Sequence, residues 1–288
     1  MADTFNKQTE SIHRQKFTPG WVLAVIFAIF WLFVAGLPLY YMLLSSFKTQ
    51  GEFIQEGLFS LPKHFGFANY ATVLSGNIWN YFKNSVLVLV ISLSLLLFIS
   101  ACAAYPLSRM RFRLNRPIYG AIVAAMSIPI HITLIPVFQM SIQTGIYDSI
   151  WALIGPNIAF NLPISVFILT SFMQGIPTEI EEAAELDGCG KGRIFFSHML
   201  PLSVPGISTI GIYNSVIIWN EFSFAMVLTQ TQKARTLPLA VWEYQGQYTI
   251  NIPLIMTLLI IASLPVILLY CFGQDKLVKG MMAGAVKG

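Results

Sequence analysis

Six long apolar stretches constrain the fold of this chain more than any other feature. The hydrocarbon core of a bilayer is about 30 Å thick, and a helix needs about 20 apolar residues to cross it. Because 56% of the residues are hydrophobic, the chain is also too apolar for a soluble domain. The sequence therefore predicts an all-α, polytopic membrane protein with six transmembrane helices. The stretches are 21–44, 85–105, 118–138, 150–172, 207–228 and 252–272.

The distribution of Lys and Arg predicts the orientation of these helices. Most of the 17 basic residues lie before the first stretch, in 109–116, in 191–193 or after the last stretch. Cytoplasmic segments of membrane proteins carry this excess. We therefore expect a cytoplasmic tail at 1–20, a permease domain at 21–272 and a cytoplasmic tail at 273–288, with outer loops at 45–84 and 229–251. Arg109, Arg111, Arg113 and Arg116 are interpreted as topogenic charge, so no nucleic-acid partner is expected.

A polar segment, 173–206, interrupts the apolar pattern on the cytoplasmic side. Thr178 and Glu181 have the spacing of a capping box, which predicts a short helix from Glu179 to Asp187. Gly188 and Gly190 would end it, with a positive φ at Gly188. A second short helix is expected over 191–199, after which Pro201 and Pro205 turn the chain back toward the membrane.

This segment concentrates negative charge in a chain that is only 10% charged. Glu181 and Glu185 are four residues apart, so like charges would repel on one face of the predicted helix. An external basic groove on a partner protein would relieve that repulsion. An amphipathic helix on the lipid surface is the alternative, but such helices are usually cationic and the cytoplasmic leaflet is anionic.

The same segment resembles the EAA signature of bacterial ABC-importer permeases. The resemblance rests on Glu182-Ala183-Ala184, then Gly188, then Leu200 and Pro201 at the family's spacing, although His198 stands where an isoleucine is usual. Four further stretches resemble the carbohydrate group, and in particular the smaller permease subunit of maltose-type importers. They are 104–109, 219–222, 235–239 with Trp242, and 283–288.

The resemblance implies a type I ABC importer permease fold with a cytoplasmic coupling helix, in a bacterial cytoplasmic membrane. It implies a heterodimer with a second homologous permease, two cytoplasmic ATPase subunits that bind ATP and magnesium, and an extracytoplasmic solute-binding protein. The chain itself is expected to have no catalytic residue and no cofactor, since 188–192 lacks the spacing of a Walker A loop. The implied coupling residues are Glu181, Glu182, Ala183, Ala184, Glu185, Asp187 and Gly188.

Polar residues inside the apolar stretches are candidates for a sugar pathway, because polar groups are costly in a bilayer unless they face protein or water. Asn157 and Asn161 are one helical turn apart and should face the same way. Asn214, Trp219, Asn220 and Glu221 add amides, an aromatic plane and a carboxylate. Hydrogen bonding between helices is the alternative role, and for Glu221 a structural or gating role is favoured.

The loop at 229–251 is the better candidate of the two outer loops for contact with a binding protein. Trp242, Tyr244, Gln245 and Gly246, followed by Gln247 and Tyr248, mix aromatic and polar groups. An aromatic belt at the membrane interface is the alternative for Trp242 and for Trp79.

Two other classes of protein were weighed. An ion-coupled secondary transporter normally has several ionisable groups at the midplane and often inverted repeats, whereas only Glu221 is clearly intramembrane here. A membrane-embedded enzyme would need a catalytic motif that the sequence lacks. His131 has no second ligand at metal-binding spacing, so no metal site is predicted.

Overall fold

The computed structural model describes residues 19–57, 59–63, 65–246 and 249–285, and from residue 275 onward it describes only the path of the helix. The expected charges of the N-terminal tail therefore lie outside the described residues. The elements are α1 (Pro19–Ser46), α2 (Gln50–Glu56), α3 (Ala68–Ser75), α4 (Ile78–Arg109), α5 (Asn115–Ala125), α6 (Ile130–Gln143), α7 (Trp151–Gln174), α8 (Glu179–Leu186), α9 (Lys191–Ile194), the π-helix η1 (Phe195–Met199), α10 (Leu200–Leu202), α11 (Val204–Trp219), α12 (Ser223–Leu228), the 3₁₀-helix η2 (Leu237–Tyr244) and α13 (Ile252–Ala285).

Four described helices, α1, α4, α7 and α13, are long and apolar enough to cross a membrane without a break. Two bent pairs bring the number to six if each pair counts as one span: α5 with α6, bent by 96°, and 191–202 with α11, bent by 68°. The sequence predicted a turn at Pro201 and Pro205, where the second bend lies, but it did not predict that the third stretch divides into two helices. The third stretch is interrupted before Pro129, which has no N–H and disfavours a helical conformation at Ile128. In the fifth stretch, 207–228, α11 ends at Trp219 and α12 follows as a separate helix.

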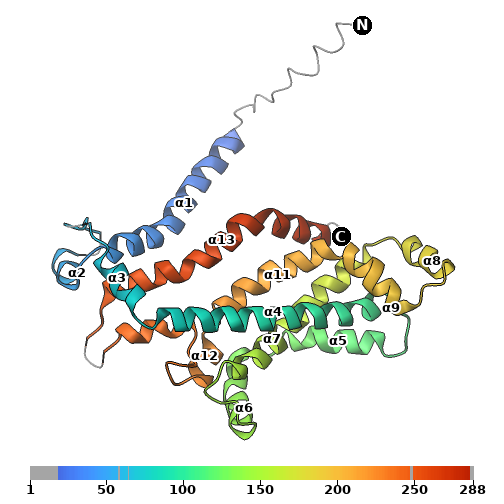
Figure 1. The fold of residues 1–288 in the computed structure, drawn as a ribbon. Coiled ribbons are helices and arrows are strands. Elements are labelled where there is room, and N and C mark those ends of the chain that lie inside the picture. The colour runs from blue at the N-terminus through green and yellow to red at the C-terminus, as the bar shows by residue number, and fades with distance from the viewer. Residues whose placement is uncertain (1–18, 58, 64, 247–248, 286–288) are drawn as a thin grey trace, which may run out of the picture.

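The centre of the molecule is a bundle in which α4, α7, α11 and α13 lie side by side (Figure 1). The small side chains of Ser92, Ser100, Ala101 and Ala104 on α4 are almost completely buried. Small residues let the backbones of membrane helices approach closely, which explains the long contact between α4 and α7. Two ends result, which we name the α8 end, with α8 and α9, and the α2 end, with α2, α3 and η2.

Close approach also explains a glycine near the α8 end. A Cβ atom added to Gly206, in the first turn of α11, would lie 2.8 Å from Cγ of Phe172 on α7. Contacts that short are essentially forbidden, so only glycine permits this distance between α7 and α11.

The first helix differs from the others because it projects away from the bundle (Figure 1). Its apolar membrane-spanning window has no buried residue, and only Leu44, Ser45 and Ser46 at its last turn are buried. Nearly the whole length of α1 is therefore available to lipid or to another protein.

Candidate functional site

The short helix predicted in the polar segment is confirmed as α8, and it protrudes at one end of the bundle (Figure 1). Glu181 and Ala184 are buried, whereas Glu179, Glu182 and Ala183 are exposed. The helix thus has one face docked on its own chain and one face directed outward. The inference from sequence did not include Leu186, whose side chain is 91% exposed at the end of α8.

The turn after α8 has the predicted conformation. Gly188 has a φ of 80°, in the left-handed region that glycine adopts without strain. The backbone N–H groups of Gly188 and Cys189 donate to Glu185 and Ala184, at 2.9 Å each. These bonds satisfy carbonyl groups at the end of the helix.

The predicted capping box at the start of α8 is wrong. Thr178 has helical torsion angles, φ −70° and ψ −26°, and its side chain makes no capping hydrogen bond. A capping residue normally has extended torsion angles that bring its oxygen onto the first free amides. The carboxylate that would complete the box, that of Glu181, points instead into the bundle.

There Glu181 forms a buried ion pair with Arg109, the last residue of α4. The distance from Arg109 Nε to Glu181 Oε1 is 2.9 Å, and the two side chains are only 7% and 10% exposed. Arg109 Nη2 also donates to the backbone carbonyl oxygens of Met173, at 2.6 Å, and of Ile176. Arg109, interpreted from sequence as topogenic charge, is therefore a structural contact among three elements.

The second acidic side chain of the predicted repulsive pair also has a cation on its own chain. Lys191 at the start of α9 pairs with Glu185, and both side chains are about half exposed. The hydrogen bond with Glu185 raises the pKa of Lys191 above its usual value. No external groove is needed to relieve repulsion between Glu181 and Glu185. The exposed carboxylates of α8 and its C-cap for which no ion pair is described are Glu179, Glu182 and Asp187.

The second short helix is longer than predicted and irregular. It runs from Lys191 to Leu202, with a π-helical turn over Phe195–Met199, and the chain then bends by 68° into α11. Ile194, Phe195 and Met199 pack with Tyr105 of α4 and Met173 of α7 in one apolar cluster. The segment between α8 and α11 is thus part of the bundle, not a free loop.

The polar residues predicted on α7 do share one face, but they are buried. Asn157 donates to Leu153 O at 2.9 Å, and Asn161 donates to Asn157 O at 2.7 Å. Asn214 of α11 donates to Ser165 Oγ at 2.9 Å. This line of bonds joins α7 to α11, which favours the alternative role of these amides as contacts between helices.

Glu221 makes its hydrogen bonds within its own chain, which favours the structural role over direct contact with a sugar. Its carboxylate oxygens accept from the backbone N–H groups of Phe224, at 2.6 Å, and Ala225, at 3.0 Å, at the start of α12. The cavity beside Glu221 and Asn157 offers about 10 Å³, about enough for one water molecule and far too little for a sugar ring. Asn220 is exposed.

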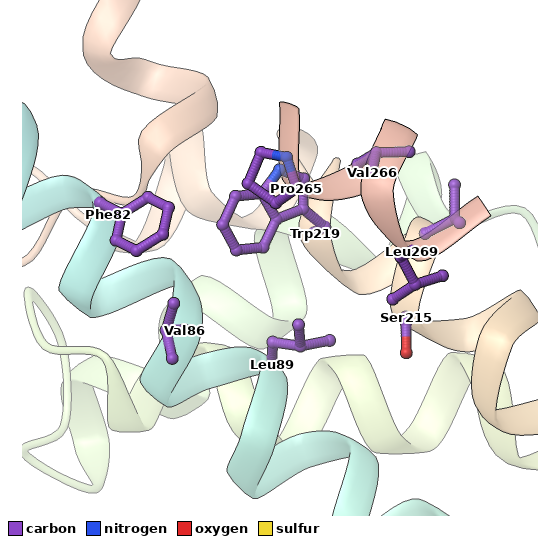
Figure 2. Close-up of a pocket in the computed structure, with 9 residues that line it drawn as sticks. Phe82, Val86, Leu89, Ser215, Trp219, Pro265, Val266 and Leu269 are labelled. Atoms are coloured by element: carbon purple, nitrogen blue, oxygen red, sulfur yellow. The ribbon is translucent and has the colours of Figure 1, made fainter. Parts of the chain in front are cut away.

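Trp219 lies in an apolar environment (Figure 2). Its ring meets Phe82 of α4 edge to face, with the ring centroids 5.6 Å apart, and its Nε1 donates to Ala262 O on α13 at 3.1 Å. The groove of about 210 Å³ beside it is lined by α4, α11 and α13, with Ser215 as the one polar side chain. Such a groove suits hydrocarbon, so this geometry does not make Trp219 a stacking platform for sugars.

At the α2 end, the loop candidates lie on η2 and just after it. The guanidinium carbon of Arg235 is 5.3 Å from the ring centroid of Trp242. Burial raises the pKa of the Tyr244 hydroxyl. Gln245 forms an isolated bridge with Ile250, and Gly246 N–H donates to Thr249 O at 2.8 Å. Gln247 and Tyr248 lie outside the described residues.

An asparagine ladder on α4, which the sequence analysis missed, holds the base of this loop. Asn80 donates to Gln232 O at 2.8 Å, and Asn84 donates to Lys233 O at 2.7 Å and to Arg235 O at 2.9 Å. Asn77, Asn80 and Asn84 are spaced so that they share one helix face. That spacing was the available signal.

Within the described residues, no group of three or more His, Cys, Asp or Glu side chains could hold a metal ion.

Comparisons of the sequence and of the fold with known proteins all find components of ABC or binding-protein-dependent transporters. Residues 96–282 match the family described as binding-protein-dependent transport system inner membrane component. The chain is 49% identical over 263 residues to a protein named as an ABC transporter permease, ORF2, of Caldicellulosiruptor sp. (strain Rt8B.4), covering 91% of this chain and 96% of that protein. It is 33% identical to the diacetylchitobiose uptake system permease protein NgcG of Streptomyces coelicolor, covering 90% and 86%. In fold it resembles a chain of a bacterial ABC transporter involved in import of the acidic polysaccharide alginate, with a TM-score of 0.76, 24% identity, and 89% and 95% coverage.

Proposed function

Since this multi-pass membrane chain belongs to the family of binding-protein-dependent transport system inner membrane components, we propose that it is a permease subunit of an ATP-driven sugar importer. In this proposal an extracytoplasmic binding protein delivers a sugar or oligosaccharide. Two cytoplasmic ATPase subunits, which bind the ATP and magnesium, drive its passage.

The observation that carries the proposal is the outward face of α8. An exposed apolar side chain, Leu186, ends a short helix that also presents the carboxylates of Glu179 and Glu182, for which no ion pair is described. Burial of a leucine against a partner contributes about 2 kcal/mol, and a basic cleft would pair with the carboxylates. We assign this face to an ATPase subunit, with Ala183 allowing close approach, while the buried Glu181 and Ala184 hold α8 on its own chain.

A second permease is proposed to complete the pathway. The apolar α1 is unburied along its membrane window, and a partner bundle would cover it. Asn157, Asn161 and Asn214 bond within their own chain, so a sugar path would run between two permeases and not through this bundle. Asn220, which is exposed, remains the best candidate of the predicted set to face that path.

The substrate class and the outer partner follow from the relatives and the α2 end. NgcG is named for uptake of a sugar, and we extend that class to this chain. Trp242, Tyr244, Gln245 and Gly246 form the proposed contact with the binding protein, on a loop whose base is fixed by Asn80 and Asn84. Both termini and α8 would then be cytoplasmic, in a bacterial cytoplasmic membrane.

Purification of the tagged chain from its own membranes tests the proposal. We expect a second permease and an ATPase to copurify in mild detergent, and Glu182→Lys to lose the ATPase and abolish sugar uptake while the chain still inserts. Glu56→Lys, which reverses a charge in a surface ion pair at the α2 end, is the matched control and should retain the ATPase. A chain that purifies alone and transports in liposomes without ATP would instead be a secondary transporter.

A further inference from the structure

We propose that Arg109 is a positioning residue that fixes α8 to the adjoining ends of α4 and α7, so that these three helix ends move as one body when the ATPase moves α8. The inference rests on the proposed function for the role of the ATPase, but the contact itself belongs to this chain alone.

The geometry gives Arg109 three attachment points on two other elements. Its Nε faces Glu181 in the first turn of α8 at 2.9 Å. Its Nη2 donates to the carbonyl oxygens of Met173, in the last turn of α7, and of Ile176, just beyond that helix. Arg109 is itself the last residue of α4. A single side chain at the end of α4 thus joins two neighbouring segments, the end of α7 and the start of α8, that lie at least 64 residues further along the sequence.

The chemistry of the site requires arginine. Guanidinium carries five N–H donors in a rigid fork, whereas the ammonium of lysine is a single point charge. The carbonyl groups of Met173 and Ile176 lie at the C-terminal end of α7, which is the negative end of its dipole. A guanidinium that donates to these carbonyl oxygens and also faces the Glu181 carboxylate therefore stabilises the end of α7 and the start of α8 together.

Burial makes this contact stiff. Tyr105, Ala184, Met173 and Phe195 belong to the apolar cluster around it, so the pair is screened by solvent far less than a surface pair. The other ion pair of this region, Lys191 with Glu185, is 58% and 46% exposed and contributes little. Separation of Glu181 from Arg109 would leave each buried charge without its counter-ion, so α8 cannot pivot freely on the bundle.

Spin-label distances between α4 and α8 test the inference. One label is placed on Cys102, which is exposed on α4. The other is placed on Thr178→Cys, the exposed N-cap position of α8 whose side chain makes no capping bond, with Cys189 and Cys271 replaced by serine. In the complex with its copurified ATPase, we expect a narrow distance distribution that stays unchanged between the nucleotide-free state and the state with ATP, magnesium and vanadate. With Arg109→Gln the distribution should broaden, and its mean should shift when nucleotide is added.

The functional readout is the ratio of sugar uptake to ATP hydrolysis. Uptake is measured in whole cells that are offered diacetylchitobiose and raffinose, and ATP hydrolysis is measured on the purified complex. We expect Arg109→Gln to lower this ratio by about tenfold, in the usual range of coupling between sites. Arg113→Gln, in the exposed charge cluster just beyond α4, should change neither readout. The exchange Arg109→Glu with Glu181→Arg should fail to restore coupling, because a carboxylate at 109 would face the carbonyls of α7.

If Arg109→Gln does not fold, Arg109→Lys replaces it, with a smaller broadening expected because the charge is kept and the fork is lost. A narrow, nucleotide-independent distance together with normal coupling in either variant would overturn the inference. Absence of any ATPase with the wild-type chain would overturn the proposed function instead. The distances in the chain alone would then still show whether Arg109 holds α8 on α4.

Discussion

Two helices of this chain begin with the same four-residue pattern and differ in what the glutamate does. At the start of α2, Thr49 Oγ1 accepts from Glu52 N–H at 3.2 Å, and Glu52 Oε2 accepts from Thr49 N–H at 2.7 Å, which is a complete capping box. At the start of α8, Thr178 caps nothing and Glu181 pairs with Arg109.

The difference teaches how a local signal gives way to a tertiary contact. Thr49 itself is exposed, and its hydroxyl and N–H both pair with Glu52 on its own helix. Glu181 is buried beside the buried guanidinium of Arg109. Leaving these two charges without their ion pair would cost more than leaving the N-terminus of α8 without a side-chain cap. The first pattern starts a helix, and the second anchors one.

The largest expected effect separates the two glutamates. Glu181→Ala should destabilise the protein by about 3–5 kcal/mol, because it leaves buried Arg109 without its counter-ion. Glu52→Ala should cost about 1 kcal/mol, because it removes half of an exposed cap. Thermal unfolding of the purified variants in detergent measures both. Equal losses would mean that the ion pair stabilises α8 no more than a cap stabilises α2.

The end of α8 provides the next comparison. Gly188→Val should cost about 2 kcal/mol, because a β-branched residue at a φ of 80° is strained, and it should weaken ATPase association. Gly190→Val is the control, since Gly190 has an extended conformation, φ −74° and ψ 160°, and no other atom lies within 4 Å of the position that an added Cβ would take. Copurification of the ATPase and the unfolding midpoint are the measurements. A Gly188→Val protein that matches the control would contradict the role of this turn.

The two threonines should differ by a smaller amount. Thr49→Ala should destabilise α2 by about 1 kcal/mol, the usual contribution of an N-cap side chain, whereas Thr178→Ala should have almost no effect. Hydrogen exchange at the amides of Glu52 and Glu181 reports each helix start separately. Faster exchange at Glu181 in the Thr178 variant would show a capping interaction in solution.

The smallest expected effect concerns Asp148, whose carboxylate bonds to backbone as that of Glu52 does. Burial alone would raise the pKa of Asp148. Hydrogen bonds from the backbone N–H groups of Thr231 and Gln230 and from the Thr231 side chain, together with the charge of Arg235, lower it by more, so the pKa lies below its usual value. The ionised form therefore stabilises the fold at neutral pH, and this contribution is lost as the pH falls through the folded-state pKa. Asp148→Asn should cost about 0.5 kcal/mol at neutral pH and progressively less in acid below the usual pKa of 3.8. A penalty that does not change with pH would assign the effect to shape, not to charge.

Much of the fold follows from the sequence, because membrane helices are selected by length and apolarity alone. The same holds for α8 and the turn at Gly188, whose signals are local. What the sequence did not predict depends on which side chains meet across elements. The burial of Arg109, the apolar surroundings of Trp219 and the asparagine ladder all require knowledge of neighbouring helices.

The glycine at 206 has a consequence for protein engineering. Replacing helical glycines by alanine is a common route to more stable proteins, with gains of about 1 kcal/mol where the new methyl group fits. Gly120 in α5 has nothing within 4 Å of such a methyl group, whereas at Gly206 it would meet the ring of Phe172 at 2.8 Å. A consensus library that treats the helical glycines alike would therefore lose part of its gains at Gly206, unless residue 172 is made smaller in the same variant.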